Sequence, residues 1–596
     1  MLSGRRWQLI LLLAAAAVFA AAVISRVNRP IPAPVPPPRA SDTPPAAVVP
    51  TGESTSLPIP DPTSAPTPAI LALAASDGVP TYREGLVGQV QRLNPLFATL
   101  NPVDADITSL IFEGLTTINA YGEPAPDLAE SWIVSSSGLE YVFTLRDDIV
   151  WHDGTPFDAA DVIFTMSLLR DRDFPGDRAL RDFWRTVETQ QLNDRQIRFR
   201  LTQPLGAFPY ALRIGILPEH VFTGMPIEAL ASHPFNFTPI GTGPYQLEAL
   251  RGADGQITQV DLRLAPNYEL RRDADIPTID RVSFRLYATF NGALAGLDAG
   301  EIDGLATRSR QERMPLQDRA VGGAVVLRNA IEPTLGAVIF NWQRETTRFF
   351  TEERVRRALL LGLDRRRLVE RTALFEQAVF AESPLIPGGW AYDPSLSTPY
   401  DVSQAQFLLS EARLDQFTPQ TAEGETPTPG GPLGFTLLVA EDPVLEPVAE
   451  QIAAQWTALG FAVAVQALPI TDLQERLDAG LFDAALVELT QLGTADPDVY
   501  DFWHDAEYPD GKNYGGVNDR IISELLERAR REPNALNRKN LYFDFQREFL
   551  ERAVAVPLYY PLYSYATTAR VENVQLGYLG KASDRFVSIA DWTLAD

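Results

Sequence analysis

The sequence predicts an α/β protein with two or more lobes, and two observations support this prediction. The chain has 596 residues, which is too many for one ordinary hydrophobic core. Between residues 434 and 489 the residue patterns follow the order strand, helix, strand, helix, strand, which is typical of a largely parallel sheet covered by helices. The composition is that of a globular protein, because 45% of the residues are hydrophobic and 21% are charged.

The first half of this segment contains a predicted strand and a predicted helix. Residues 434–440 (GFTLLVA) form a short apolar run of residues that favour strands. Apolar residues then recur at helical spacing and make one stripe, and Gly460 follows at a natural C-terminal stop. The stripe consists of Leu445, Val448, Ile452, Trp456 and Leu459.

The second half repeats the pattern. Residues 461–465 alternate between larger and smaller side chains, as a strand does. Thr471 and Gln474 have the spacing of a capping box, which predicts a second helix that ends at Gly480. Residues 481–489 are again apolar and predict the last strand of the segment.

Two more helices are predicted outside this segment. One begins after Thr351, with Glu352 and Glu353 in a first turn where the helix dipole favours anions. The other begins at Asn518. Both carry an apolar stripe that we expect to lie in the core. The stripes are Val355, Ala358, Leu359, Gly362 and Leu363 in the first helix, and Ile521, Ile522, Leu525, Leu526 and Ala529 in the second.

The N-terminus carries a targeting signal followed by a tether. Two arginines precede an apolar run, residues 9–24, which is close to the roughly 17–25 residues that cross a bilayer. We expect residues 1–27 to be a membrane anchor, which the long tether favours, or a signal peptide cleaved near Ala20–Ala22. Residues 28–80 are expected to be a disordered, proline-rich linker, and residues 417–431 an exposed loop.

Charge and rare residue types limit the function. The chain has 77 acidic and 51 basic residues and a net charge of -26, which favours solubility and disfavours a nucleic-acid partner. Cysteine is absent, so the protein has no disulfide, thiolate metal site, cysteine nucleophile or lipid-bearing cysteine. The four histidines lack the helical spacing of a zinc site, and we expect no metal or other cofactor. They are His152, His220, His233 and His504.

Catalytic motifs are also missing from the sequence. It contains no glycine-rich phosphate loop of standard spacing, no HExxH motif and no G-x-S-x-G nucleophile elbow. The run His152-Asp153-Gly154 is expected to be a turn rather than part of a metal-dependent hydrolase, because no partner histidine is near it in the sequence. Binding is therefore favoured over catalysis, and we do not expect an enzyme.

Several sequence blocks, spread over nearly all of the chain from about residue 82, resemble one known family. They include Glu113–Leu115 (EGL), Pro126–Trp132 (PDLAESW), Phe143–Arg146 (FTLR), Trp151–Phe157 (WHDGTPF), Gly241–Tyr245 (GTGPY), Val355–Ala358 (VRRA), Asp496–Asp498 (DPD) and Val556–Leu558 (VPL). In this order the blocks resemble the family 5 extracellular solute-binding proteins, which serve ABC importers of the peptide/nickel type.

The resemblance implies a two-lobed periplasmic-binding-protein architecture, type II-like, with a small extra domain inserted early. The lobes would close on a ligand at their interface. The protein would be a monomeric, non-enzymatic binding component that works with a permease and an ATPase, in the periplasm or on the outer face of the cytoplasmic membrane. The implied domains are lobe I at 81–120, 241–330 and 561–596, the small domain at 121–240, and lobe II at 331–560.

One position departs from the family pattern. Peptide-binding members carry an aspartate three residues before the late Asp-Pro or Glu-Pro, and it pairs with the ligand's α-ammonium. Here Asp496 and Pro497 are present, but the position three residues back is Gly493. A peptide-type ligand and an oligosaccharide that stacks on aromatic rings both remain open. The candidate ligand-binding residues are Asn341, Trp342, Trp390, Tyr392, Gly493, Asp496, Trp503 and Tyr514.

Two other functions stay open at this point. An anchored sensory module would bind a ligand in the same way but signal through a membrane partner. A secreted hydrolase would need an acid pair or a triad in the cleft, and nothing in the linear sequence singles one out.

Overall fold

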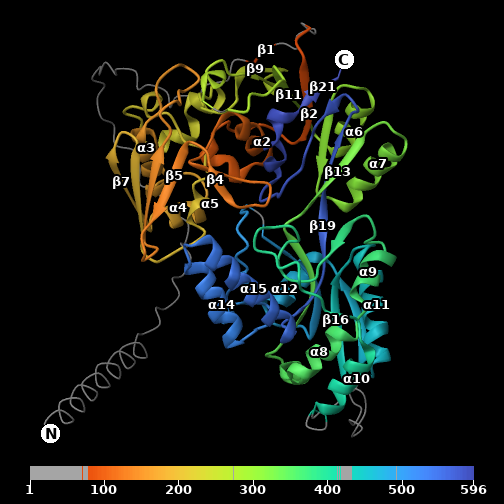
Figure 1. Ribbon diagram of the computed structural model, residues 1–596. Coiled ribbons are helices and arrows are strands. Elements are labelled where there is room, and N and C mark those ends of the chain that lie inside the picture. The colour runs from red at the N-terminus through yellow and green to blue at the C-terminus, as the bar shows by residue number, and fades with distance from the viewer. Residues whose placement is uncertain are drawn as a thin grey trace, which may run out of the picture. The chain divides into compact units, whose positions relative to one another are not determined.

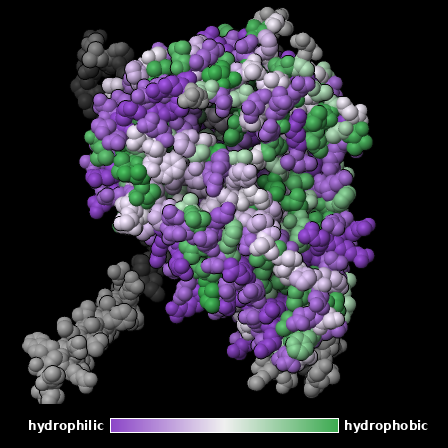
Figure 2. All heavy atoms as spheres, in the orientation of Figure 1, coloured by the Kyte–Doolittle hydropathy of each residue, from purple (hydrophilic) through white to green (hydrophobic). Residues whose placement is uncertain are grey.

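The computed structural model describes residues 70–71, 78–272, 274–412, 414, 417, 433–491 and 493–595, which belong to one compact unit, Ser64–Asp596. The predicted anchor, most of the predicted linker and most of the predicted loop at 417–431 lie outside these ranges. Among the described residues, no helix has the length and apolar character needed to cross a membrane. Hydrophilic side chains cover much of the face shown in Figure 2, in agreement with the high net charge.

One large mixed sheet runs through both lobes (Figure 1). In lobe I, β2 pairs in parallel with β11 and β12. In lobe II, β16 pairs in parallel with β17 and β18, whereas β14 pairs with β18 antiparallel. The lobe I strands are β1 (Ile70–Leu71), β9 (Tyr245–Ala253), β10 (Gln256–Leu264), β11 (Arg281–Tyr287), β2 (Thr81–Val87), β12 (Gly304–Thr307) and β13 (Val326–Ile331). The lobe II strands are β14 (Thr334–Phe340), β15 (Ala378–Phe380), β18 (Ala484–Thr490), β16 (Gly434–Ala440) and β17 (Ala462–Leu468).

Strand β19 (Val556–Thr567) connects the two lobes, and Figure 1 shows it running from one to the other. Its first part pairs with β14 and β15 of lobe II, and its second part pairs with β12 and β13 of lobe I. All 12 of its residues are buried. β13 continues into β14 after a short break, where the Glu332 amide donates to the Pro561 carbonyl at 2.9 Å. Two strands that run side by side therefore carry the connection.

A separate four-stranded antiparallel sheet flanks lobe I (Figure 1). Its strands are β5 (Ala129–Val134), β6 (Glu140–Leu145), β8 (Gln196–Leu201) and β7 (Val187–Asn193), with helices α3 (Ala159–Arg170) and α4 (Arg178–Trp184) alongside. The buried residues of this sheet form one continuous core with those of lobe I. The sheet is therefore fixed to lobe I by packing.

Helix α2 (Pro102–Ile111) of lobe I starts where its sequence favours a helix end. The Asn101 side chain accepts a hydrogen bond from the Val103 amide, and Pro102 occupies the first helical position, where no amide hydrogen is needed. One face of α2 is buried in the lobe I core through Val103, Ile107 and neighbouring residues. Its remaining face contributes to the cavities described below.

Lobe II is covered by helices that have a buried apolar stripe. In α11 (Leu445–Ala458) the stripe includes Val448, Ile452 and Trp456, and the Trp456 indole nitrogen donates to the Leu359 carbonyl at 2.9 Å. The other helices are α8 (Glu353–Leu361), α9 (Arg365–Arg371), α10 (Val402–Glu411), α12 (Ile470–Asp478), α14 (Arg520–Arg531) and α15 (Ala535–Glu551). The stripes predicted for α8 and α14 are buried apart from Ile521, which is 42% exposed. Gly362 and Leu363 are buried as well, but they lie beyond the end of α8.

The α/β fold class is confirmed, and the predicted order from 434 to 489 appears as β16, α11, β17, α12 and β18. The helix α11 ends just before Gly460, which has a φ of 106°. The sheet is only partly parallel, because β14 joins β18 in the opposite direction. The prediction of a largely parallel sheet is therefore confirmed for β16, β17 and β18 and is wrong for β14, which lies next to β18.

Three details of the sequence prediction are wrong. No capping box starts α12, because the helix begins at Ile470 after Pro469 and has no side-chain cap. Helix α14 begins two residues after Asn518, because the Asp519 carboxylate caps it by accepting from the amides of residues 521 and 522. The predicted linker at 28–80 also ends too late: Ile70 and Leu71 pair in parallel with β9, which gives these two apolar residues a sheet edge to join.

Candidate ligand-binding site

A cavity of about 580 Å³ lies between the two lobes. Lobe II contributes residues 493–495, which follow strand β18. Lobe I contributes α2, the neighbouring turn η1 (Pro95–Leu100) and residues 581–583 near the C-terminus. Helix α4 and the turn at Tyr210 complete the lining from the side of the four-stranded sheet. The cavity is therefore built from parts of the chain that are far apart in sequence.

Gly493 places bare backbone at the edge of this cavity. Its amide donates to the carbonyl of Gly580 at 3.0 Å, so the lobe II loop touches the C-terminal segment of lobe I. Its φ is 93°, a conformation that residues with a side chain rarely adopt, and no atom lies within 4 Å of the place where a Cβ would sit. The position can offer a ligand backbone groups and open space.

Five charged side chains line the cavity, two acidic and three basic: Asp106, Asp177, Arg213, Arg308 and Lys581. Both acids already have partners. Asp106 accepts two hydrogen bonds from the buried Arg585 guanidinium, at 2.9 and 2.8 Å. Asp177 caps α4 by accepting from the Ala179 amide at 2.7 Å. Basic groups therefore outnumber acids here, although the chain as a whole has a net charge of -26.

Two of the three basic groups also have a partner. Arg213 pairs with Asp584 at 2.5 Å, and Arg308 pairs with Glu332 at 2.6 Å. Within the described part of the chain, no acid forms an ion pair with the ammonium of Lys581. Lys581 is the cation of this cavity whose charge is left for a ligand.

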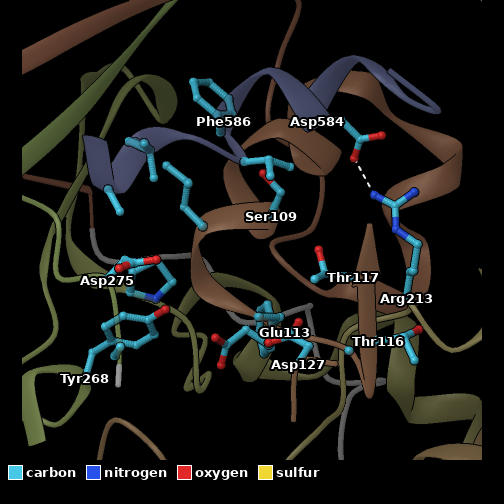
Figure 3. Close-up of a pocket in the computed structure, with 18 of the residues that line it drawn as sticks. Ser109, Glu113, Thr116, Thr117, Asp127, Arg213, Tyr268, Asp275, Asp584 and Phe586 are labelled. Atoms are coloured by element: carbon cyan, nitrogen blue, oxygen red, sulfur yellow. Dashed lines mark hydrogen bonds and ion pairs between the residues drawn. The ribbon is translucent and has the colours of Figure 1, made fainter. Parts of the chain in front are cut away.

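A second cavity, of about 550 Å³, adjoins the first and shares five lining residues with it: Ser109, Phe112, Arg213, Lys581 and Ser583. Figure 3 shows the Arg213–Asp584 ion pair on one side and Glu113 beside Asp127 on the other. Arg271 holds Glu113 through two hydrogen bonds of 2.8 and 2.9 Å. Burial, with the neighbouring Glu113 charge, raises the pKa of Asp127 well above its usual value, although Arg271 opposes this shift.

Direct contacts hold the two lobes together beside the cavity. The Trp390 indole nitrogen of lobe II donates to the Tyr210 hydroxyl at 2.9 Å, and the Tyr210 hydroxyl donates to the Gly122 carbonyl at 2.8 Å. The Gly206 amide also donates to the Arg530 carbonyl of α14 at 2.8 Å. Opening the lobes would have to break these bonds.

The two acids of the late Asp-Pro-Asp block are already paired. Asp496 accepts from both terminal nitrogens of Arg538, at 2.5 and 2.7 Å, and each of these side chains is only 3% exposed. Burial disfavours the charged guanidinium, but Asp496 outweighs burial and holds the pKa of Arg538 well above its usual value. Asp498 pairs with Arg530 at 2.5 Å. Neither acid is free for a ligand ammonium in this structure.

Most of the other predicted site residues pack within lobe II. The Asn341 amide nitrogen donates to the carbonyls of Gly480 and Phe482, at 3.0 Å each. Trp342 lies under the Arg356 guanidinium, 3.8 Å from ring centre to Cζ, and the Trp503 ring meets Phe549 edge-on. The Tyr514 hydroxyl accepts from Gln474 at 3.2 Å, and the Tyr392 amide donates to the Gly389 carbonyl at 3.1 Å.

Of the eight predicted residues, Gly493 lines the interlobe cavity. Trp390 does not line it, but its indole nitrogen donates to the hydroxyl of Tyr210, which does. Sequence reasoning missed Tyr210, Arg213 and Lys581. They belong to no recognisable motif, and only the fold brings the segment that holds Tyr210 and Arg213 together with the distant segment that holds Lys581. One general feature of the sequence bears on these residues, namely the excess of acidic over basic residues. In a chain of that composition, a group of basic side chains around one cavity is unusual.

Comparisons with known proteins agree on one family. A model of the bacterial extracellular solute-binding proteins, family 5 Middle, matches residues 123–511, which is more than half of the chain. The oligopeptide-binding protein AppA of Bacillus subtilis is 27% identical over 523 residues, covering 86% of this chain and 91% of AppA. Di/tripeptide-binding protein 2 of Pseudomonas aeruginosa is 27% identical over 479 residues, covering 76% of this chain and 84% of that protein.

Solved structures show the same fold. HbpA2 from Haemophilus parasuis matches with a TM-score of 0.72 at 20% identity, covering 87% of this chain and 100% of that chain. NikZ from Campylobacter jejuni, in complex with Ni(L-His), matches with a TM-score of 0.60 at 24% identity, covering 86% and 99%. At these identities the likeness concerns the two-lobed fold.

Proposed function

Since the chain belongs to the bacterial extracellular solute-binding proteins of family 5, we propose that it captures a peptide-type ligand between its lobes and delivers it to an ABC importer. Proteins of this family are binding components of transport systems and work outside the cytoplasm. The permease and ATPase subunits of that importer are the partners of this proposal, with the chain acting as a monomer.

The observation that carries the proposal is the interlobe cavity. Its volume of about 580 Å³ is within the usual range for small-molecule sites, roughly 300–1,000 Å³, and both lobes contribute to its lining. A ligand bound there would touch α2 and the Gly493 loop at once. Ligand binding would then favour the arrangement in which the lobes meet, and an importer can recognise that arrangement.

A peptide-type ligand is favoured over the alternatives. Both sequence relatives described above are named for oligopeptides or di/tripeptides. An oligosaccharide gains no support from them, and the aromatic rings suggested for sugar stacking in lobe II, Trp342 and Trp503, are packed against Arg356 and Phe549. We also propose that the segment before Ile70 tethers the folded part to the membrane.

Ligand capture followed by scattering tests this function. The protein, expressed with its native N-terminus, is purified without denaturation, and any bound small molecules are identified by mass spectrometry. X-ray scattering then compares the protein depleted of ligand with the protein saturated with the identified compound. A smaller radius of gyration with ligand supports closure of the lobes. An unchanged radius at saturation would argue for a rigid site and against the importer role.

A further inference from the structure

Lys581 stands where the two cavities meet, because it lines both of them. Its side chain is partly buried. The two acids whose charges act on Lys581 are paired with other groups. Asp584 pairs with Arg213 and accepts from the amides of Gly580 and Lys581, at 2.9 and 3.0 Å. Asp106 pairs with the Arg585 guanidinium. The ammonium of Lys581 therefore lies among groups that already satisfy one another.

The surroundings of Lys581 favour an incoming anion. Burial lowers the pKa of Lys581, and the neighbouring Arg213 charge lowers it further, although Asp584 and Asp106 oppose the shift. A ligand anion would offset part of the cost of burying the charged ammonium, because it would give the ammonium a charged partner. A peptide that brought only an ammonium would instead place a third cation beside Lys581 and Arg213.

The hydroxyl group of Ser583 lines the same two cavities as Lys581 and has no hydrogen-bond partner among the described residues. The Ser583 side chain is 4% exposed. Buried hydroxyls are normally satisfied, so an unpaired one at a cavity wall indicates a place for a ligand atom. A hydroxyl can donate to a carboxylate oxygen that also contacts Lys581.

We propose that Lys581, assisted by the Ser583 hydroxyl, binds a carboxylate of the ligand, so that the interlobe cavity selects peptide-type ligands that carry a free acid group. This inference rests on the proposed function, because it assigns the ligand chemistry of the same cavity. Arg213 adds positive potential from the side without giving up its own ion pair with Asp584.

A matched pair of probes tests the proposal by calorimetry. N-acetyl-trialanine and its C-terminal amide have the same length and no ammonium, and they differ in one carboxylate. The acid should bind more tightly by roughly 10- to 150-fold, the range expected for a hydrogen bond to a charged group. In Lys581→Gln the preference should disappear, and in Lys581→Arg it should largely remain. Lys539→Gln, on helix α15 outside both cavities, is the control and should keep the preference.

Lysine labelling of the wild-type protein gives a second readout that does not depend on any variant. The sequence has three lysines, Lys512, Lys539 and Lys581, so mass spectrometry can follow each one separately after brief acylation. N-acetyl-trialanine should protect Lys581 and leave the other two unchanged. Labelling of Lys581 at the same rate with and without saturating acid would overturn the proposal.

The outcomes separate this inference from the proposed function. Equal binding of the acid and the amide, or a preference that survives in Lys581→Gln, contradicts the role of Lys581 and leaves peptide capture standing. Failure of both probes to bind, together with failure of a broad peptide mixture, contradicts peptide capture itself and the inference with it. Binding of inorganic phosphate that depends on Lys581, without binding of the acid, would overturn the carboxylate assignment.

Discussion

The indole nitrogen of Trp390 in lobe II donates a 2.9 Å hydrogen bond to the hydroxyl of Tyr210, a residue that lines the interlobe cavity from the other side. Both side chains are 8% exposed. The same hydroxyl donates to the carbonyl of Gly122, which lies in the turn between the paired strands β3 (Thr116–Ile118) and β4 (Pro124–Pro126). A chain of two hydrogen bonds therefore runs from lobe II to this turn. This bond exists only while the lobes are together.

Tyr210→Phe should therefore favour the open arrangement. The change leaves the buried Trp390 indole without its acceptor, and such a loss costs about 1–3 kcal/mol, which is roughly 5- to 150-fold in a coupled equilibrium. We expect weaker ligand binding and a larger radius of gyration in the ligand-free protein, measured by calorimetry and X-ray scattering. Tyr121→Phe is the matched control, because that ring is 62% exposed. Equal affinities in all three proteins would show that the bond does not report on closure.

The buried ion pair of Asp496 and Arg538 should contribute to stability. Asp496→Asn leaves a guanidinium that is 3% exposed without its charged partner, and breaking a buried pair in this way typically costs about 3–5 kcal/mol. Denaturant unfolding, with the midpoint as readout, should show this loss. Asp501→Asn removes the more exposed partner of Arg530 and should cost less than about 1 kcal/mol. Comparable losses in the two variants would contradict the structural role given to Asp496.

Stability should also fall as the solution becomes acidic, because of His152. Its Nδ1 accepts from the Gly241 amide at 3.1 Å, and its Nε2 lies 2.9 Å from the Gly243 carbonyl, so the ring is bonded in its neutral form. Burial is the main reason that the pKa of His152 falls from 6.5 to about 4. Between these two values the unfolded chain binds a proton that the folded chain does not, so unfolding is favoured as the pH drops from about 6.5 to 4.

The contribution of His152 can be isolated by substitution. His152→Gln cannot titrate, so its free energy of unfolding should depend less on pH between about 6.5 and 4, by an amount on the order of 3 kcal/mol over the window. The variant should also be less stable than the wild type at neutral pH, because it loses one or both bonds to the 241–243 turn. Urea unfolding at several pH values measures both effects. Parallel pH profiles for the two proteins would show that another group is responsible.

The sequence predicted regular elements better than it predicted the site. Periodicity located β16, α11 and β18, because burial of one face leaves a local pattern in the chain. The start of α12 was misread, because a Thr–Gln spacing occurs there without the hydrogen bonds of a capping box, and Pro469 takes the cap position instead. The family resemblance, rather than periodicity, supplied the two-lobed architecture.

The cavity could not be predicted in the same way. Tyr210, Gly493 and Lys581 come from three segments that are distant in sequence, and no spacing rule connects them. Aromatic residues were chosen as ligand contacts because rings often line sites, but Trp342 and Trp503 are also large apolar side chains, and the lobe II core uses them as such. Gly493 lines the cavity. The expectation from the family resemblance, that its missing side chain changes the chemistry available to the ligand, stays a prediction.

Free short peptides should bind less tightly than peptides with a blocked amino end. Gly493 stands where the family resemblance implies an aspartate, and it offers only backbone. Asp496 and Asp498 are held by arginines at 2.5 Å. A ligand ammonium buried in the cavity would lack a partner of its own, and an uncompensated buried charge costs several kcal/mol. Trialanine and N-acetyl-trialanine share the carboxylate and differ in this charge. Calorimetry should show the acetylated peptide binding at least about tenfold more tightly, which corresponds to about 1.4 kcal/mol.

The alternative is that an acid in the cavity takes over the role of the missing aspartate. Asp177 is the candidate to check, because its hydrogen bonds to the start of α4 leave one carboxylate oxygen available. Tighter binding of free trialanine that is lost in Asp177→Asn would show that Asp177 receives the ammonium. If both the wild type and Asp177→Asn bind free trialanine more tightly than N-acetyl-trialanine, the lobes bring a different acid to the ligand. Either result would refute the inference drawn from Gly493. Preference for the acetylated peptide in both proteins would support it. The cavity would then bind the acid end of its ligand and leave the amino end without a charged partner.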